Sequence, residues 1–131
     1  MTTDQLKPKQ VTKRLLSGLT ERSRAVLTSR YGLGTDPARM TLEGIGGVYG
    51  ITRERVRQIE NHALDTIRRS PQFAGEEETF SVLHERFVEH GGLLKEEDAL
   101  RMLARDKSAQ NHAYWLLVLD KPYTRKKENN E

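Results

Sequence analysis

The chain has 131 residues, of which 31% are charged and 35% hydrophobic; this suits one or two small domains and excludes a large enzyme scaffold. It contains no cysteine, which excludes a disulfide framework, a thiolate metal site and a cysteine nucleophile. No apolar run approaches the roughly 20 residues of a membrane helix, and the start of the chain lacks the apolar stretch of a signal peptide, so we expect a cytoplasmic protein without membrane contact.

The charge is unevenly distributed along the chain. The net charge is +3, but residues 1–70 hold thirteen Lys and Arg against seven Asp and Glu, a balance of +6. Residues 71–131 hold nine against twelve, a balance of −3. A basic half favours attraction to phosphates, and a well-solvated surface is the alternative interpretation.

The first forty residues predict a tail followed by two helical segments. Residues 1–13 are polar, contain a proline and show no helical stripe, so we expect a loose N-terminal tail. A helical segment is expected at roughly residues 13–19, and Thr20 is a good N-cap for another that runs to about Leu33. Glycines and a proline in residues 32–40 predict a loop.

Residues 41–69 have the pattern of a helix-turn-helix. Thr41 is the N-cap of a short apolar-striped helix, Gly50 permits a sharp turn, and Thr52 caps a longer helix to about Arg69. At about 100° per residue, one side of the longer helix is apolar. That stripe consists of Val56, Ile59, Ala63 and Ile67. The opposite side carries Arg53, Glu54, Arg57, Gln58 and Asn61.

The polar side of this helix has the residue types that read DNA bases. Arg binds guanine in a bidentate way, Glu accepts from cytosine, and Gln pairs with adenine. The alternative is an exposed face joined by ion pairs. We take as candidate DNA-binding residues the five polar residues and the two N-caps: Thr41, Thr52, Arg53, Glu54, Arg57, Gln58 and Asn61. Arg68 and Arg69, at the far end, are expected to reach only phosphates or solvent.

Five short strings in this region resemble region 4 of primary-type bacterial sigma factors. They are LTERSRAVL at 19–27, RYGL at 30–33, TLEGIG at 41–46, GITRERVRQIE at 50–60 and AL at 63–64. The resemblance covers residues 14–70. It implies a four-helix, helix-turn-helix domain that reads the −35 promoter element in the major groove through Arg53, Glu54, Arg57 and Gln58. It also implies docking on the flap of the RNA polymerase β subunit through the surface around residues 19–31.

Two features depart from a complete sigma factor. Gly44 stands where the family usually has an acidic residue, and two more glycines beside it predict an unusually soft short helix. About twelve residues upstream cannot hold the sigma elements that bind core polymerase most strongly and melt the −10 region. We therefore expect either a fragment or a protein that uses region 4 without being a complete sigma factor.

The second half predicts a separate module. Residues 72–78 include three consecutive glutamates and are expected to be an exposed acidic linker between a domain at 14–71 and one at 79–131. Helices are expected from residue 79, over 95–105 and from about residue 108. The strings FSVL at 80–83, HGGLL at 90–94 and WLLVL at 115–119, with the helix over 99–103, more weakly resemble the HARE-HTH winged-helix module. The resemblance implies a wing hairpin beginning at residues 123–125, whose returning strand is missing, so we expect the natural protein to continue beyond residue 131.

The remaining candidates favour structural roles. The four histidines are scattered without the spacing of a metal site, and Trp115 lies in an apolar run typical of a core. There is no glycine-rich phosphate loop, and the acidic residues at 96–98 suit the start of a helix. We expect no catalysis, no metal, no cofactor and no small-molecule substrate.

The sequence therefore predicts a mainly α-helical protein with a helix-turn-helix domain followed by a small winged-helix domain. The leading hypothesis is a sequence-specific transcription factor that binds double-stranded DNA at a −35-like element and acts with RNA polymerase. A second hypothesis is a regulator that docks on the polymerase flap with little DNA binding. A third is the DNA-targeting head of a larger DNA-modifying enzyme.

Overall fold

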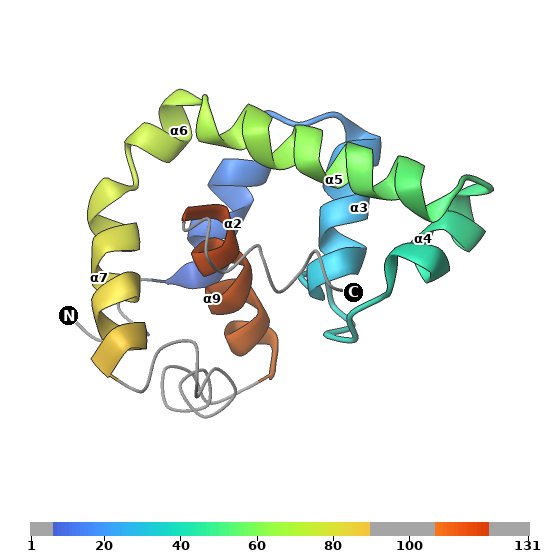
Figure 1. The fold of residues 1–131 in the computed structure, drawn as a ribbon. Coiled ribbons are helices and arrows are strands. Elements are labelled where there is room, and N and C mark those ends of the chain that lie inside the picture. Colours follow the sequence, from blue (N-terminus) through green and yellow to red (C-terminus); the bar gives the residue numbers. More distant parts are fainter. Residues whose placement is uncertain (1–6, 90–106, 121–131) are drawn as a thin grey trace.

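The computed structural model describes residues 7–89 and 107–120, and its regular elements in these two ranges are helices without a strand (Figure 1). The helices are α2 (Pro8–Leu16), α3 (Glu21–Tyr31), α4 (Leu42–Tyr49), α5 (Arg53–Arg68), α6 (Pro71–Ala74), α7 (Glu77–Glu89) and α9 (Lys107–Asp120). The predicted mainly α-helical class is confirmed for the described residues. The helix expected over 95–105 and the wing expected from residue 123 lie outside them.

The three predicted threonine N-caps are confirmed. The side-chain oxygens of Thr20, Thr41 and Thr52 accept hydrogen bonds from the backbone amides three residues later, at 3.2, 3.0 and 3.1 Å. Each bond satisfies a donor that the first helical turn leaves without a partner inside the helix. Gly32 and Gly50 end α3 and α4 in the left-handed conformation, with φ of 66° and 69°, which glycine adopts without steric cost.

Helix α2 begins five residues before the helical segment that the sequence predicts. The expectation of a loose tail up to residue 13 is wrong from Pro8 onward, because Pro8 occupies the first turn of a helix. Proline is tolerated there because an amide in the first turn has no partner within the helix. Val11, Thr12 and Leu15 are buried, so α2 contributes one face to the core.

The buried hydrophobic residues form two clusters. The smaller cluster joins the helix-turn-helix to α3 and consists of Val26, Leu42, Ile45, Val56 and Ile59. The larger cluster joins both halves of the chain. It consists of Val11, Leu15, Leu16, Leu19, Leu27, Tyr31, Ala63, Leu64, Ile67, Phe80, Leu83 and residues 113–119. Residues before and after the expected linker thus share one core.

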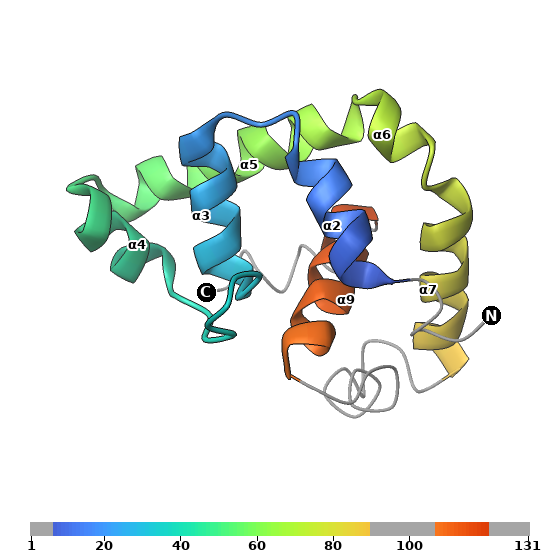
Figure 2. The ribbon, with the colours of Figure 1, turned by 180° about the vertical axis from the view of Figure 1, so that it is seen from behind.

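Helix α9 lies at the centre of the larger cluster. Figures 1 and 2 show α5, α6 and α7 as an arch, with α2 and α9 beneath it and α3 beside them. Helix α9 packs against α2, α7, α3 and α5. Trp115, whose apolar run predicts a core position, is fully buried there. The third helix of the expected second module is therefore surrounded by helices of the first.

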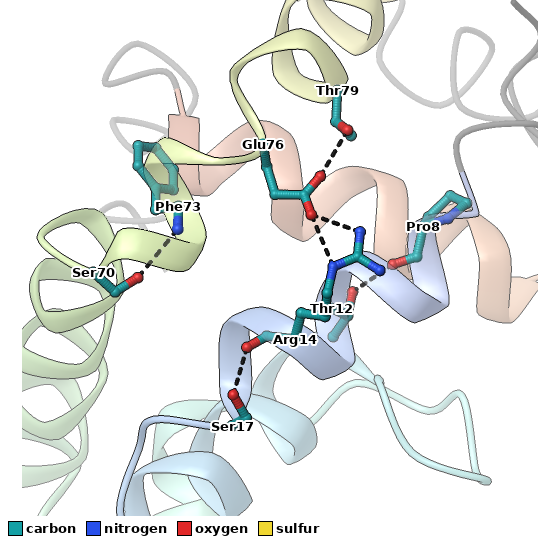
Figure 3. A network of polar contacts seen from close by, with 8 residues as sticks. All are labelled: Pro8, Thr12, Arg14, Ser17, Ser70, Phe73, Glu76 and Thr79. Carbon is teal, nitrogen blue, oxygen red and sulfur yellow. Dashed lines mark hydrogen bonds and ion pairs between the residues drawn. The ribbon is translucent and has the colours of Figure 1, made fainter.

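The acidic stretch 72–78 is largely helical in the structure and attached to α2. Helix α6 covers its first residues, with Ser70 capping the amide of Phe73 at 3.2 Å, and α7 begins at Glu77. The carboxylate of Glu76 accepts from the guanidinium of Arg14 at 2.9 and 2.5 Å and from the hydroxyl of Thr79 at 2.8 Å (Figure 3). These contacts offset the repulsion between neighbouring glutamates that favours an extended linker.

Candidate nucleic-acid interface

The turn between α4 and α5 depends on close backbone packing at Gly46. The amide of Ile51 donates to the carbonyl of Gly46 at 2.9 Å, just before α5 begins. A Cβ at position 46 would lie 2.6 Å from the carbonyl oxygen of Ile51, which is closer than real Cβ atoms come. Glycine at this position therefore fixes how tightly α4 and α5 join, and so the direction in which the start of α5 projects.

The predicted two-sided character of α5 is confirmed as geometry. Val56, Ile59, Ala63 and Ile67 are all buried, with at most 8% of their surface exposed. Among the candidate residues, Thr41, Thr52, Arg53, Glu54 and Gln58 are exposed, and Arg57 and Asn61 are partly exposed. The structure thus brings six of the seven together at the cap and first nine residues of α5, while Thr41 lies at the start of α4.

Ion pairs and hydrogen bonds connect the polar residues of α5. The guanidinium of Arg57 contacts a carboxylate oxygen of Glu54 at 3.2 Å, with 43% and 59% of the two side chains exposed. Arg55 donates to the side-chain oxygen of Gln58 at 3.3 Å. Surface pairs of this kind contribute little to stability, and their side chains can exchange partners when a charged ligand arrives.

The structure adds Arg55 and part of α3 to the candidate surface. A cleft of about 570 Å³ separates the start of α3 from the side of α5. Its lining consists of Thr20, Arg22, Ser23, Arg55, Gln58, Ile59 and His62. The helical wheel could have found Arg55, which is three and seven residues from Gln58 and His62. The approach of α3 to this side of α5 could not be read from local pattern.

A buried polar group connects α3 to the middle of α5. The hydroxyl of Tyr31 donates to one carboxylate oxygen of Glu60 at 2.5 Å, and the guanidinium of Arg30 lies 3.8 Å from the other. Arg30 also donates to the backbone carbonyl of Met40 at 3.2 Å, in the loop before α4. Because these side chains are about nine-tenths buried, their contacts hold α5 in a fixed position relative to α3.

The expectation for Arg68 is wrong. Its guanidinium donates to the backbone carbonyls of Leu119 and Val118, at 2.7 and 3.3 Å, and so faces the last turn of α9. Those carbonyls lack partners inside their own helix, and a cation beside them also complements the negative end of the helix dipole. Arg69, the next residue, is exposed, as expected.

The surface around residues 19–31, which the resemblance assigns to polymerase docking, is partly covered by α9. Leu19, Leu27 and Tyr31 lie in the same buried cluster as α9. The ring of Tyr31 lies 6.3 Å from that of Tyr114 and 6.2 Å from that of Trp115. The apolar side of α3 is therefore in contact with another helix of the same chain.

No helix in residues 7–89 and 107–120 is long and apolar enough to cross a membrane. Within the same ranges, His, Asp and Glu side chains form no group of three that could hold a metal ion.

Comparison with known proteins gives one family and several relatives. Residues 15–69 match the family described as Sigma-70, region 4. The RNA polymerase sigma factor RpoD of Helicobacter pylori is 49% identical over 59 residues, which are 45% of this chain and 9% of that protein. The sigma factor SigA of a Bacillus species is 52% identical over 54 residues, 41% of this chain and 14% of that protein. The SigA of Nostoc is 51% identical over 57 residues, 43% and 14% of the two chains. No solved structure is significantly similar to this chain.

Proposed function

We propose that this protein, whose residues 15–69 match the family described as Sigma-70, region 4, is a non-enzymatic transcription factor. It binds double-stranded DNA in a sequence-specific way and acts with RNA polymerase. The site is a −35-like element, entered in the major groove by the first half of α5. The chain spans 9–14% of the length of the relatives above, so these activities are assigned to the domain and not to a complete sigma factor.

The observation that carries the proposal is the polar first half of α5 above a buried apolar stripe. The base-reading residues are Arg53, Glu54, Arg57, Gln58 and Asn61. Their types include bidentate donors for guanine and adenine edges and an acceptor for cytosine. Thr41 and Thr52 lie where two helices begin, and the positive ends of these helices attract phosphate groups.

The contact between Arg57 and Glu54 has to be broken or shared when Arg57 binds a base. In the free protein the guanidinium of Arg57 is 3.2 Å from a carboxylate oxygen of Glu54. To bind a guanine edge with two hydrogen bonds, Arg57 either leaves Glu54 or keeps it as a shared partner that fixes the side chain. Where Arg57 leaves it, Glu54 is free to accept from a cytosine amino group on a neighbouring base pair. This pairing explains how a carboxylate can lie on a DNA-binding face without repelling the duplex.

Polymerase association is the second part of the proposal, with the β subunit flap as the partner. The supporting observation is that the apolar side of α3, at residues 19–31, accepts a helix in this structure. We expect the protein in the cytoplasm, where bacterial DNA and polymerase are found. The alternative, a docking regulator with little DNA binding, is distinguished by the experiment below.

The test is binding of the full chain to labelled −35-like and scrambled duplexes at several salt concentrations. We expect tighter binding to the −35-like duplex, with a log–log salt slope of about −0.9 per phosphate neutralised. The basic balance of residues 1–70 is the physical reason for that slope. Equal affinity for both duplexes, a flat salt dependence, or no binding at low salt would contradict the DNA-reading function and favour the docking regulator.

A further inference from the structure

Most of helix α9 is buried in the protein. The nine consecutive residues from Asn111 to Leu119 are all buried. A helix on the surface of a domain normally buries one stripe and exposes the other. We call the surface of α2, α3, α5 and α7 that contacts α9 the α9 seat. It is a surface that packs against a largely apolar helix.

Polar contacts hold the first half of α9 in the seat. The side-chain amide of Asn111 donates to the carbonyls of Pro37 and Gly32, at 2.7 and 3.1 Å. Its oxygen accepts from Arg39 at 2.9 Å, and the guanidinium of Arg39 lies 4.5 Å from the centre of the Tyr114 ring. Arg39 is exposed, so its contacts with Asn111 and Tyr114 lie at the edge of the core.

The last turn of α9 is held from outside in the same way. Arg68, the final residue of α5, donates to the carbonyls of Leu119 and Val118. Its side chain is 24% exposed, and a nearby contact with Asp65 at 3.2 Å orients the guanidinium. Two arginines thus act on α9 from the rim of the seat, one near each end.

The helix-turn-helix keeps its own core beside the α9 seat. The smaller cluster, with Val56 and Ile45 at its centre, contains no residue of α9. The larger cluster is built around α9 and contains Leu19, Leu27 and Tyr31 from the surface that the resemblance assigns to polymerase docking, whereas Val26 of α3 belongs to the smaller cluster. A second helix of similar apolar character could therefore take the place of α9 without removing packing partners from the smaller cluster.

We propose that α9 is an internal competitor for polymerase docking: it occupies the groove in which this region 4 domain would receive the β subunit flap, and the flap binds by displacing it. This inference rests on the polymerase part of the proposed function and not on the DNA-reading part. Only molecules whose seat is open are competent to bind, so the apparent affinity for the flap is lowered by the fraction that is open. Weakening the hold on α9 raises that fraction.

The experiment uses the full chain and the isolated β flap domain of a bacterial RNA polymerase, with any tryptophan of the flap replaced. Trp115 is the only tryptophan of the chain and is fully buried, so its fluorescence reports the departure of α9. We expect the flap to shift Trp115 emission to the red and to increase its quenching by acrylamide. Arg68→Ala should tighten flap binding about tenfold, the equivalent of about 1.4 kcal/mol.

Arg69→Ala is the matched control, because it removes a neighbouring arginine of the same charge that faces solvent, and we expect it to leave flap binding unchanged. Arg39→Ala is a second test at the other end of α9 and should act like Arg68→Ala. Circular dichroism of each free variant checks that it folds.

Three results would overturn the proposal. The first is flap binding while Trp115 stays protected from acrylamide. The second is equal flap affinity in the wild type, Arg68→Ala and Arg39→Ala. The third is no flap binding by any of these three proteins. The same proteins are titrated with the −35-like duplex. If the wild type does not bind the duplex, the DNA-reading function is contradicted, but the conclusion that α9 and the flap compete is unaffected.

Discussion

The indole Nε1 of Trp115 donates a hydrogen bond of 2.8 Å to Oγ1 of Thr12, joining α9 to α2 across 103 positions of the chain. The same hydroxyl donates to the carbonyl of Pro8 at 2.9 Å and lies 2.8 Å from Nδ1 of His112. A hydroxyl has one proton and two lone pairs. With the proton directed to Pro8 and one lone pair accepting from the indole, the second lone pair can accept from Nδ1 of His112.

Replacement of Thr12 by valine should destabilise the protein. The variant keeps the shape of the side chain but removes the acceptor of the buried indole N–H and the contact with His112, at a cost of about 1–3 kcal/mol. Urea unfolding followed by circular dichroism measures the loss. Thr12→Ser keeps the hydroxyl and should recover most of the stability. A valine variant as stable as the wild type would show that the hydroxyl does not fasten α9 to α2.

Replacement of Glu60 by alanine should cost about 3 kcal/mol of unfolding free energy, because it removes the carboxylate beside the largely buried guanidinium of Arg30. It also removes the acceptor of the Tyr31 hydroxyl. Asp65→Ala is the control, since Asp65 is 52% exposed in its contact with Arg68, and its loss should change stability by less than about 1 kcal/mol. Similar costs for the two variants would mean that the buried group does not fix α5 on α3.

Two neighbouring glycines of α4 should respond oppositely to alanine. Gly46→Ala places a Cβ against the Ile51 carbonyl and should lower the melting temperature. A Cβ at Gly47 meets no atom within 4 Å, and Gly47→Ala should stabilise the protein by about 0.5–1 kcal/mol because alanine favours the helix. Thermal unfolding of both variants decides this. Stabilisation by both would contradict the close α4–α5 contact.

Replacement of Arg57 by alanine should weaken binding to the preferred duplex by about 1–3 kcal/mol and relax discrimination at one base pair. A base-substitution scan of the duplex, carried out for each variant, measures both effects. Val56→Asp is the folding control, since it places a charge in a fully buried position and should abolish structure and binding together. A folded Arg57→Ala variant with unchanged affinity and preference would refute base reading by this side chain.

The features that the sequence predicted correctly are those set by residues close together in the chain. A threonine cap depends on an amide three residues away, and the buried stripe of α5 depends on helical spacing alone. The polar surface of α5 was predictable because it also follows from helical spacing. Whether its residues read DNA bases stays a prediction.

The features that the sequence could not provide depend on long-range packing. Arg68 looked like a free surface cation because its partners are carbonyls about fifty residues away. The start of α2 looked like a tail because its few apolar residues become buried by packing against α9, which lies far along the chain. The acidic stretch looked like a linker because Arg14, which binds Glu76, is 62 residues distant.

The division of the core into two clusters sets an order for events during synthesis. All residues of the smaller cluster, from Val26 to Ile59, leave the ribosome before α9 has been made. The helix-turn-helix and the part of α3 that packs on it can therefore fold first, while the apolar residues of α2 and of the other side of α3 remain uncovered until α9 has been translated. Helix α9 begins about fifty codons after Ile59. During that interval the nascent chain presents an open groove, and any apolar helix that reaches it before α9 meets no competitor.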